Sequence, residues 1–223
     1  MKKLIFGMIL LLSASAFGQN RFELNDASQY FDIKINVAKC EDTSCSGKAS
    51  FSFYKKGGTV PYQVINKADT YVDLGDNGKP EANQTMLYDK QSAVNVGDFN
   101  FDGMEDVAIC NGLNGSYGMP SYDVYLSSRA TKKFVYSPAF KPLGVQLGMF
   151  EVDKDKKTLT VFGKSGCCWH ITERYDVVAN KPRKIFEEVE DATIADTTKV
   201  KVTTKTLVAG KWKTTTKMVK REE

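Results

Sequence analysis

Four oxygen-bearing side chains recur at fixed spacing in a short stretch near the middle of the chain. They stand at positions 1, 3, 5 and 9 of one segment: Asp98, Asn100, Asp102 and Asp106. Gly103 stands at position 6, where a calcium loop needs a sharp turn. Because Ca²⁺ takes about six to eight oxygen ligands, alternate residues of such a loop must point inward. The sequence therefore predicts a Ca²⁺ site, with the backbone carbonyl of Met104 as a further ligand and Asp106 binding directly or through a water.

This segment departs from an EF-hand beyond its ninth position. Position 12 is Ile109 instead of a bidentate glutamate, and the run Val107–Cys110 is typical of a short buried strand. We therefore expect a loop that leads into a strand. The alternative is an Asx-rich turn without a metal, because Asn, Asp and Gly favour turns by themselves.

A glycine-rich stretch follows the expected strand. It consists of Asn114, Gly115, Ser116, Tyr117 and Gly118. We expect an exposed loop, whose tyrosine offers a large contact area with a polar tip and could fill a cleft in a partner. The alternative is a tight hairpin loop whose tyrosine packs back on the sheet.

Catalytic motifs are absent from the sequence. His170 is the only histidine, and neither G-x-S-x-G nor H-E-x-x-H surrounds it. Flanked by Trp169 and Ile171, it is typical of a packed strand residue. A glycosidase needs only two positioned carboxylates, but the sequence places no such pair at the required separation. We therefore do not expect an enzyme.

The five cysteines favour disulfides in an oxidising compartment, with one thiol left over. Cys40 and Cys45 flank a short polar loop and form the first expected pair. The second pair stays open between a bond from Cys110 to Cys167 or Cys168 and a bond between these two neighbours. Zinc is a weaker alternative, because the spacings are not those of C-x₂-C knuckles.

Residues 98–126, followed by Ser165–His170, resemble a family of small periplasmic bacterial proteins related to lysozyme inhibitors and peptidoglycan-hydrolase immunity proteins. The resemblance spans roughly residues 59–189. The Asp-rich loop also resembles those of FG-GAP β-propeller repeats, but one copy is too few for a propeller.

The family resemblance implies inhibition of a peptidoglycan-degrading enzyme, such as a lysozyme, by a loop inserted into its active-site cleft. The Asn114–Gly118 segment is similar to the Ser-Gly-x-Tyr loop of invertebrate-type lysozyme inhibitors. Gly115 and Tyr117 match that loop, whereas Asn114 replaces the serine, so Asn114 or Ser116 would have to donate the hydrogen bond. We expect Ca²⁺ to hold this neighbouring loop in its binding conformation.

Residues 1–18 are predicted to be a signal peptide. Lys2 and Lys3 precede an apolar run and then small residues, with cleavage expected after Gly18. No cysteine lies near that site, so no lipoprotein anchor is expected, and no later apolar run has the length of a membrane span. The sequence thus indicates a periplasmic or secreted protein, for which nucleic acid is a poor candidate partner.

Charge is distributed unevenly along the chain. Between Lys199 and Arg221 there are eight Lys or Arg residues and no acid, although the whole chain carries a net charge of only +4. We therefore divide the mature chain into a domain of residues 19–190 and a basic extension of residues 191–223. A hairpin is expected around Ala209–Gly210, with lysines that either guard a solvated edge or contact cell-wall or surface glycan. Glycan binding through this hairpin is the alternative function.

Short β-branched and aromatic runs, separated by turn signals, make the expected fold all-β: an antiparallel sandwich or a barrel-like domain. The strands are expected at residues 30–37, 49–54, 62–65, 70–74, 107–110, 121–126, 134–137, 149–152, 158–163, 169–178 and 184–189.

Overall fold

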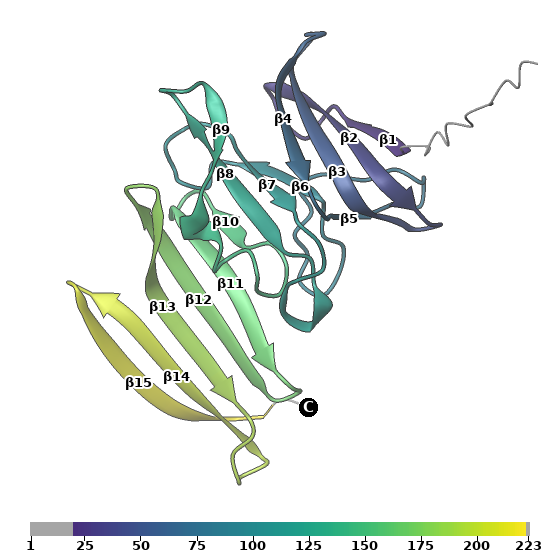
Figure 1. The fold of residues 1–223 in the computed structure, drawn as a ribbon. Helices are drawn as coiled ribbons and strands as arrows, with labels where there is room; N and C mark the ends of the chain where they lie inside the picture. The colour runs from purple at the N-terminus through teal and green to yellow at the C-terminus, as the bar shows by residue number, and fades with distance from the viewer. Residues whose placement is uncertain (1–19, 222–223) are drawn as a thin grey trace, which may run out of the picture.

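The computed structural model describes residues 20–221, so the expected signal peptide of residues 1–18 lies outside the described residues. The described chain is almost entirely β, and its strands form three antiparallel sheets. Figure 1 places the first sheet at one end, the second in the middle and the third at the other end. The all-β prediction is confirmed. None of the three sheets closes into a barrel within residues 20–221.

The first sheet has five strands, in the order β1-β2-β3-β4, with β5 also paired to β3. Its strands are β1 (Asn20–Leu24), β2 (Phe31–Cys40), β3 (Ser44–Lys55), β4 (Pro61–Lys67) and β5 (Tyr71–Asp73). Ile33, Ile35 and Val37 alternate with polar residues along β2, and all three are fully buried. This period of two directs one face of the sheet into the core.

The second sheet is a four-stranded meander. It contains β6 (Val94–Gly97), β7 (Asp106–Cys110), β8 (Tyr122–Ser128) and β9 (Lys133–Tyr136). All five residues of β7 are buried, so this strand is covered on both faces. Short 3-10 turns lie at η1 (Ser116–Gly118) and η2 (Pro138–Phe140).

The third sheet is a six-stranded meander. It contains β10 (Glu151–Asp153), β11 (Thr158–Ser165), β12 (Trp169–Val178), β13 (Lys181–Asp191), β14 (Lys199–Val208) and β15 (Lys211–Lys220). Leu159 and Val161 on β11 join the hydrophobic core, whereas almost all of β15 is exposed. The expected basic hairpin is present as β14–β15, and β14 pairs with β13, so the hairpin continues this sheet.

One hydrophobic core connects the three sheets. Its buried members include Phe51 and Phe53 on β3, Ile109 on β7 and Leu159 on β11. None of the helices within residues 20–221 is long and apolar enough to cross a membrane.

A buried ion pair also joins the first two sheets. Lys67 on β4 pairs with Asp123 on β8, and their side chains are only 9% and 18% exposed. Removing one partner of such a buried pair is costly, because the remaining charge has neither a counter-charge nor full hydration.

We expect Lys67→Met to lower the free energy of unfolding by about 3 kcal/mol, because it leaves the Asp123 carboxylate buried and unpaired. The double variant Lys67→Met/Asp123→Leu should recover most of that loss. Urea denaturation of both variants measures the effect. A double variant as unstable as the single one would contradict this explanation.

Candidate functional site

The segment from Asp98 to Met104 is a tight loop between β6 and β7. The Asp98 carboxylate accepts hydrogen bonds from the backbone N–H of Asp102 at 3.0 Å and of Gly103 at 2.8 Å. Asp102 in turn accepts from the Met104 N–H at 2.9 Å. Gly103 has a φ of +87° and Phe101 a φ of +61°, and these left-handed residues let the loop coil around Asp98.

Asp106 has a different role from the other acids of this loop. It is fully buried at the start of β7, and its two oxygens accept hydrogen bonds from the backbone N–H of Phe99 at 2.9 Å and of Ser127 at 2.8 Å. The pKa of Asp106 is raised to about 7, mainly by burial. Repulsion from Asp102 and Asp98 also raises this pKa, whereas the two backbone hydrogen bonds lower it. Asp106 thus fastens the loop to β8.

The outer side of the loop contacts two other turns. The Asn100 side-chain nitrogen donates to Asn180 in the β12–β13 turn at 3.0 Å and to the Asp102 carboxylate at 3.1 Å. Arg129, in the β8–β9 turn, donates to the Asp102 carbonyl at 3.1 Å. No cluster of three or more His, Cys, Asp or Glu side chains suited to a metal occurs among residues 20–221. Any cation here would therefore depend on amide, carbonyl and water oxygens besides the carboxylates.

The Asn114–Gly118 loop is anchored at its base. Gly115 donates its N–H to the Met119 carbonyl at 2.9 Å, and Ser116 donates to the Gln146 carbonyl at 3.0 Å. A Cβ at position 115 would lie 2.7 Å from the Met119 carbonyl oxygen, so the position needs glycine for space. The Asn114 amide donates to the Asn111 carbonyl at 3.0 Å.

Tyr117 projects from this anchored base. Its φ is +58° and its side chain is 61% exposed, yet its hydroxyl accepts the Gly166 N–H at 2.6 Å. The Lys164 ammonium lies 4.7 Å from the centroid of the Tyr117 ring and 4.7 Å from that of Tyr88. Gly166 and Lys164 both belong to the β11–β12 hairpin. Through these two residues the third sheet holds the exposed Tyr117 ring in one orientation.

The cysteines lie in three separate places. Cys40 is bonded to Cys45 between β2 and β3, and Cys167 is bonded to its neighbour Cys168 in the β11–β12 turn beside Gly166. Cys110 is a buried thiol whose pKa is raised by burial. Of the two arrangements left open for the second pair, the structure has the bond between neighbours.

Two expectations about positions were wrong. The Asp98–Asp106 loop and the Asn114–Gly118 loop lie at opposite ends of β7, about 15 Å of strand apart, and are therefore not neighbours. His170 lies on β12 as expected, between Lys164 and Glu190 of the neighbouring strands, but its side chain is exposed and not packed. Sequence reasoning also missed Lys164 and Gly166 as partners of Tyr117.

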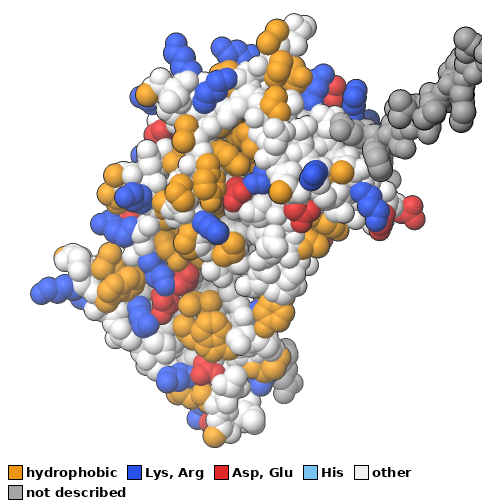
Figure 2. Space-filling view, in the orientation of Figure 1, with side chains coloured by type: hydrophobic (Ala, Val, Ile, Leu, Met, Phe, Trp, Pro, Cys, Tyr) orange, Lys and Arg blue, Asp and Glu red, His pale blue; other side chains and the backbone are white. Residues whose placement is uncertain are grey.

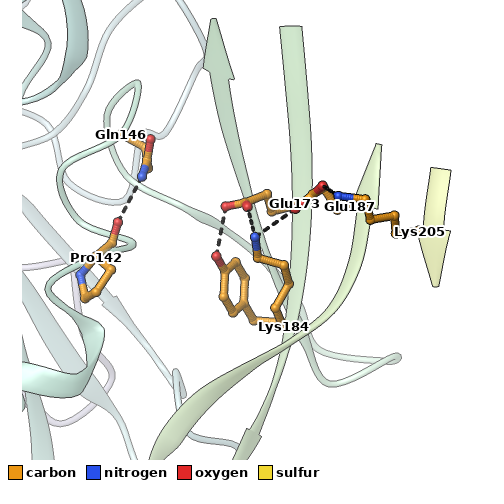
Figure 3. Close-up of polar contacts among 7 residues, drawn as sticks. Pro142, Gln146, Glu173, Lys184, Glu187 and Lys205 are labelled. Atoms are coloured by element: carbon orange, nitrogen blue, oxygen red, sulfur yellow. Dashed lines mark hydrogen bonds and ion pairs between the residues drawn. The ribbon is translucent and has the colours of Figure 1, made fainter. Parts of the chain in front are cut away.

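Charged side chains on β12, β13 and β14 form a network (Figure 3). Lys184 pairs with Glu173 and, at 3.0 Å, with Glu187, and Lys205 pairs with Glu187 at 2.7 Å. Hydrogen bonds from Lys205 and Lys184 lower the pKa of Glu187. Since each acid here has a cationic partner, the network joins neighbouring strands.

No protein-family model and no curated protein matches this chain. A solved structure, described as a Xanthomonas type IV secretion system related protein, is similar, with a TM-score of 0.67 and 23% sequence identity. The match covers 87% of this chain and 92% of the other. This likeness shows a shared fold.

We expect Tyr117→Phe to speed amide hydrogen exchange at Gly166 severalfold, because the variant removes the hydroxyl that accepts this N–H, a contact worth about 1 kcal/mol. NMR-detected exchange measures the effect. Tyr136→Phe, in another exposed tyrosine, is the control and should leave Gly166 unchanged. Equal exchange in all three proteins would show that the contact does not order the loop.

Proposed function

We propose that this protein is exported and inhibits a peptidoglycan-degrading enzyme, with the Asn114–Gly118 loop entering the enzyme's active-site cleft. The presentation of Tyr117 carries this proposal. Its ring is exposed, while its hydroxyl, its cationic neighbour Lys164 and the base of its loop are already fixed. A contact residue fixed before binding loses less conformational entropy on association.

Two further observations are compatible with this proposal. The sequence resembles periplasmic inhibitors and immunity proteins over residues 59–189. The solved protein with a similar fold is described as related to a type IV secretion system, which is compatible with a role in export or outside the cytoplasm.

The loop is a better candidate than the basic β14–β15 hairpin. Lysines of β15 occur on both faces of the strand, since Lys211, Lys213 and Lys217 share one face and Lys220 lies on the other. This distribution along an unpaired edge is typical of protection against edge-to-edge aggregation. Glycan binding by the hairpin remains the second candidate.

Tyr117→Ala should abolish protection of purified cell walls against the target enzyme, because it removes the inserted ring. The assay titrates the mature protein into a panel of lysozymes, other glycosidases and amidases, and it follows wall lysis. Tyr136→Ala is the matched control, because Tyr136 is also exposed but lies on β9, outside the Asn114–Gly118 loop. Stoichiometric protection that survives Tyr117→Ala would refute insertion of this loop.

We also propose that the Asp98–Asp106 loop binds Ca²⁺. Its donors are all oxygen atoms, from Asp98, Asn100, Asp102 and the Met104 carbonyl, which suits a hard cation. The Asp98 and Asp102 carboxylates form no ion pair within residues 20–221, and their repulsion contributes to the raised pKa of Asp106. Bound Ca²⁺ would relieve that repulsion. Since this loop lies far from Tyr117, we assign it a stabilising role.

Ca²⁺ at about 100 times its dissociation constant should stabilise the protein by roughly 2.7 kcal/mol. Thermal unfolding with Ca²⁺ and with a chelator measures this shift. Asp98→Ala/Asp102→Ala should remove the shift, whereas Asp76→Ala, which alters an exposed acid outside the loop, should keep it. If the wild-type protein has the same Tm with Ca²⁺ and with a chelator, the loop is a turn without a metal.

A further inference from the structure

A cavity lies away from the Tyr117 loop, between the first sheet, residues 103–105 of the Asp98–Asp106 loop, and the turn that joins β8 to β9. Its volume is about 480 Å³, within the usual range for small-molecule sites. The side chains that matter for binding are Tyr30, Phe31, Lys55, Tyr62, Glu105, Arg129 and Lys132. None of the cavity's lining residues belongs to the Asn114–Gly118 loop.

Aromatic rings form one wall of this cavity. The centroids of Phe31 and Tyr62 lie 5.1 Å apart, and those of Phe31 and Phe134 lie 5.4 Å apart, so the rings brace one another. Tyr30 is 55% exposed and lies within the same cavity lining. Such rings offer broad apolar faces, and the Tyr30 hydroxyl adds a polar tip. The wall therefore suits a ligand with a flat C–H face, such as a sugar ring.

The cavity is positively charged. Lys55, Arg129 and Lys132 are exposed and take part in no ion pair among residues 20–221. Glu105, the only acid of the lining, accepts hydrogen bonds from the Ser28 hydroxyl and, at 3.3 Å, from the Gln29 N–H. Figure 2 shows basic side chains at this end of the molecule as well as along the rest of the visible face. Three cations against one engaged carboxylate favour an anionic ligand.

The strand edge beside the cavity is closed to an added peptide strand. The side-chain amide of Gln63 donates to the Phe134 carbonyl at 2.9 Å and accepts the Phe134 N–H at 2.8 Å. The Tyr62 hydroxyl donates to the Lys132 carbonyl. Because strand addition needs free backbone groups, these contacts favour a compact ligand over an extended acidic peptide.

We propose that this cavity binds an acidic sugar, a carboxylate-bearing hexose unit of an anionic glycan. The sugar ring packs on Tyr30 and Tyr62, and Lys55, Arg129 and Lys132 bind its carboxylate through charge-assisted hydrogen bonds. The site is independent of the proposed inhibitory loop, so each can fail without the other.

The probe is trigalacturonate, titrated calorimetrically into the mature protein, with neutral trigalactose as its uncharged counterpart. Trigalacturonate should bind at least about tenfold more tightly than trigalactose and should weaken with added salt. Lys55→Met/Lys132→Met should lower the affinity by about tenfold or more, and Tyr30→Ala should lower it as well. Circular dichroism confirms that each variant is folded.

Two controls separate this site from the rest of the surface. Lys79→Met, which removes an exposed charge outside the cavity, and Tyr117→Ala should both keep the affinity of the wild type. The proposal is overturned if trigalacturonate does not bind, if trigalactose binds equally, or if Lys55→Met/Lys132→Met retains full affinity. It is also overturned if an acidic hexapeptide binds more tightly, since that result assigns the cavity to a protein partner.

Discussion

Complete burial of β7 is the constraint on which the arrangement of both candidate loops depends. Because β7 is covered on both faces, its first residue, Asp106, is buried as well. A buried carboxylate is costly unless its oxygens are satisfied, and the N–H groups of Phe99 and Ser127 satisfy them. The chain before β7 must therefore coil back over Asp106, and the oxygen-rich loop is the result. The Tyr117 loop begins beyond the other end of the same strand.

The third sheet has two roles that follow from where it meets the core. Its inner strand β11 contributes Leu159 and Val161 to the common core, and the turn after it brings Lys164 and Gly166 to Tyr117. Its outer strands extend into solvent, where the ion pairs around Glu187 join neighbouring strands. The end of the sheet at the β11–β12 turn is thus the part that contacts the exposed loop.

The two surfaces that we propose for binding would recognise their ligands through different interactions. Tyr117 is a single exposed ring held in place before association, which suits insertion into a cleft. The cavity near Tyr62 combines packed aromatic rings with cations that form no ion pair among residues 20–221, which suits a small anion.

Local patterns in the sequence determined most strands and the identity of the loops. Alternation at Ile33, Ile35 and Val37 and the apolar run Val107–Cys110 predicted β2 and β7, although the shorter strands β1 and β6 were missed. The exposure of His170, the distance between the two loops, and the contacts of Lys164 and Gly166 with Tyr117 were decided by tertiary structure. Side-chain periodicity records only which face of a strand is buried. Which residues meet across about 50 positions of sequence depends on how whole sheets pack, and that packing is a property of the complete core.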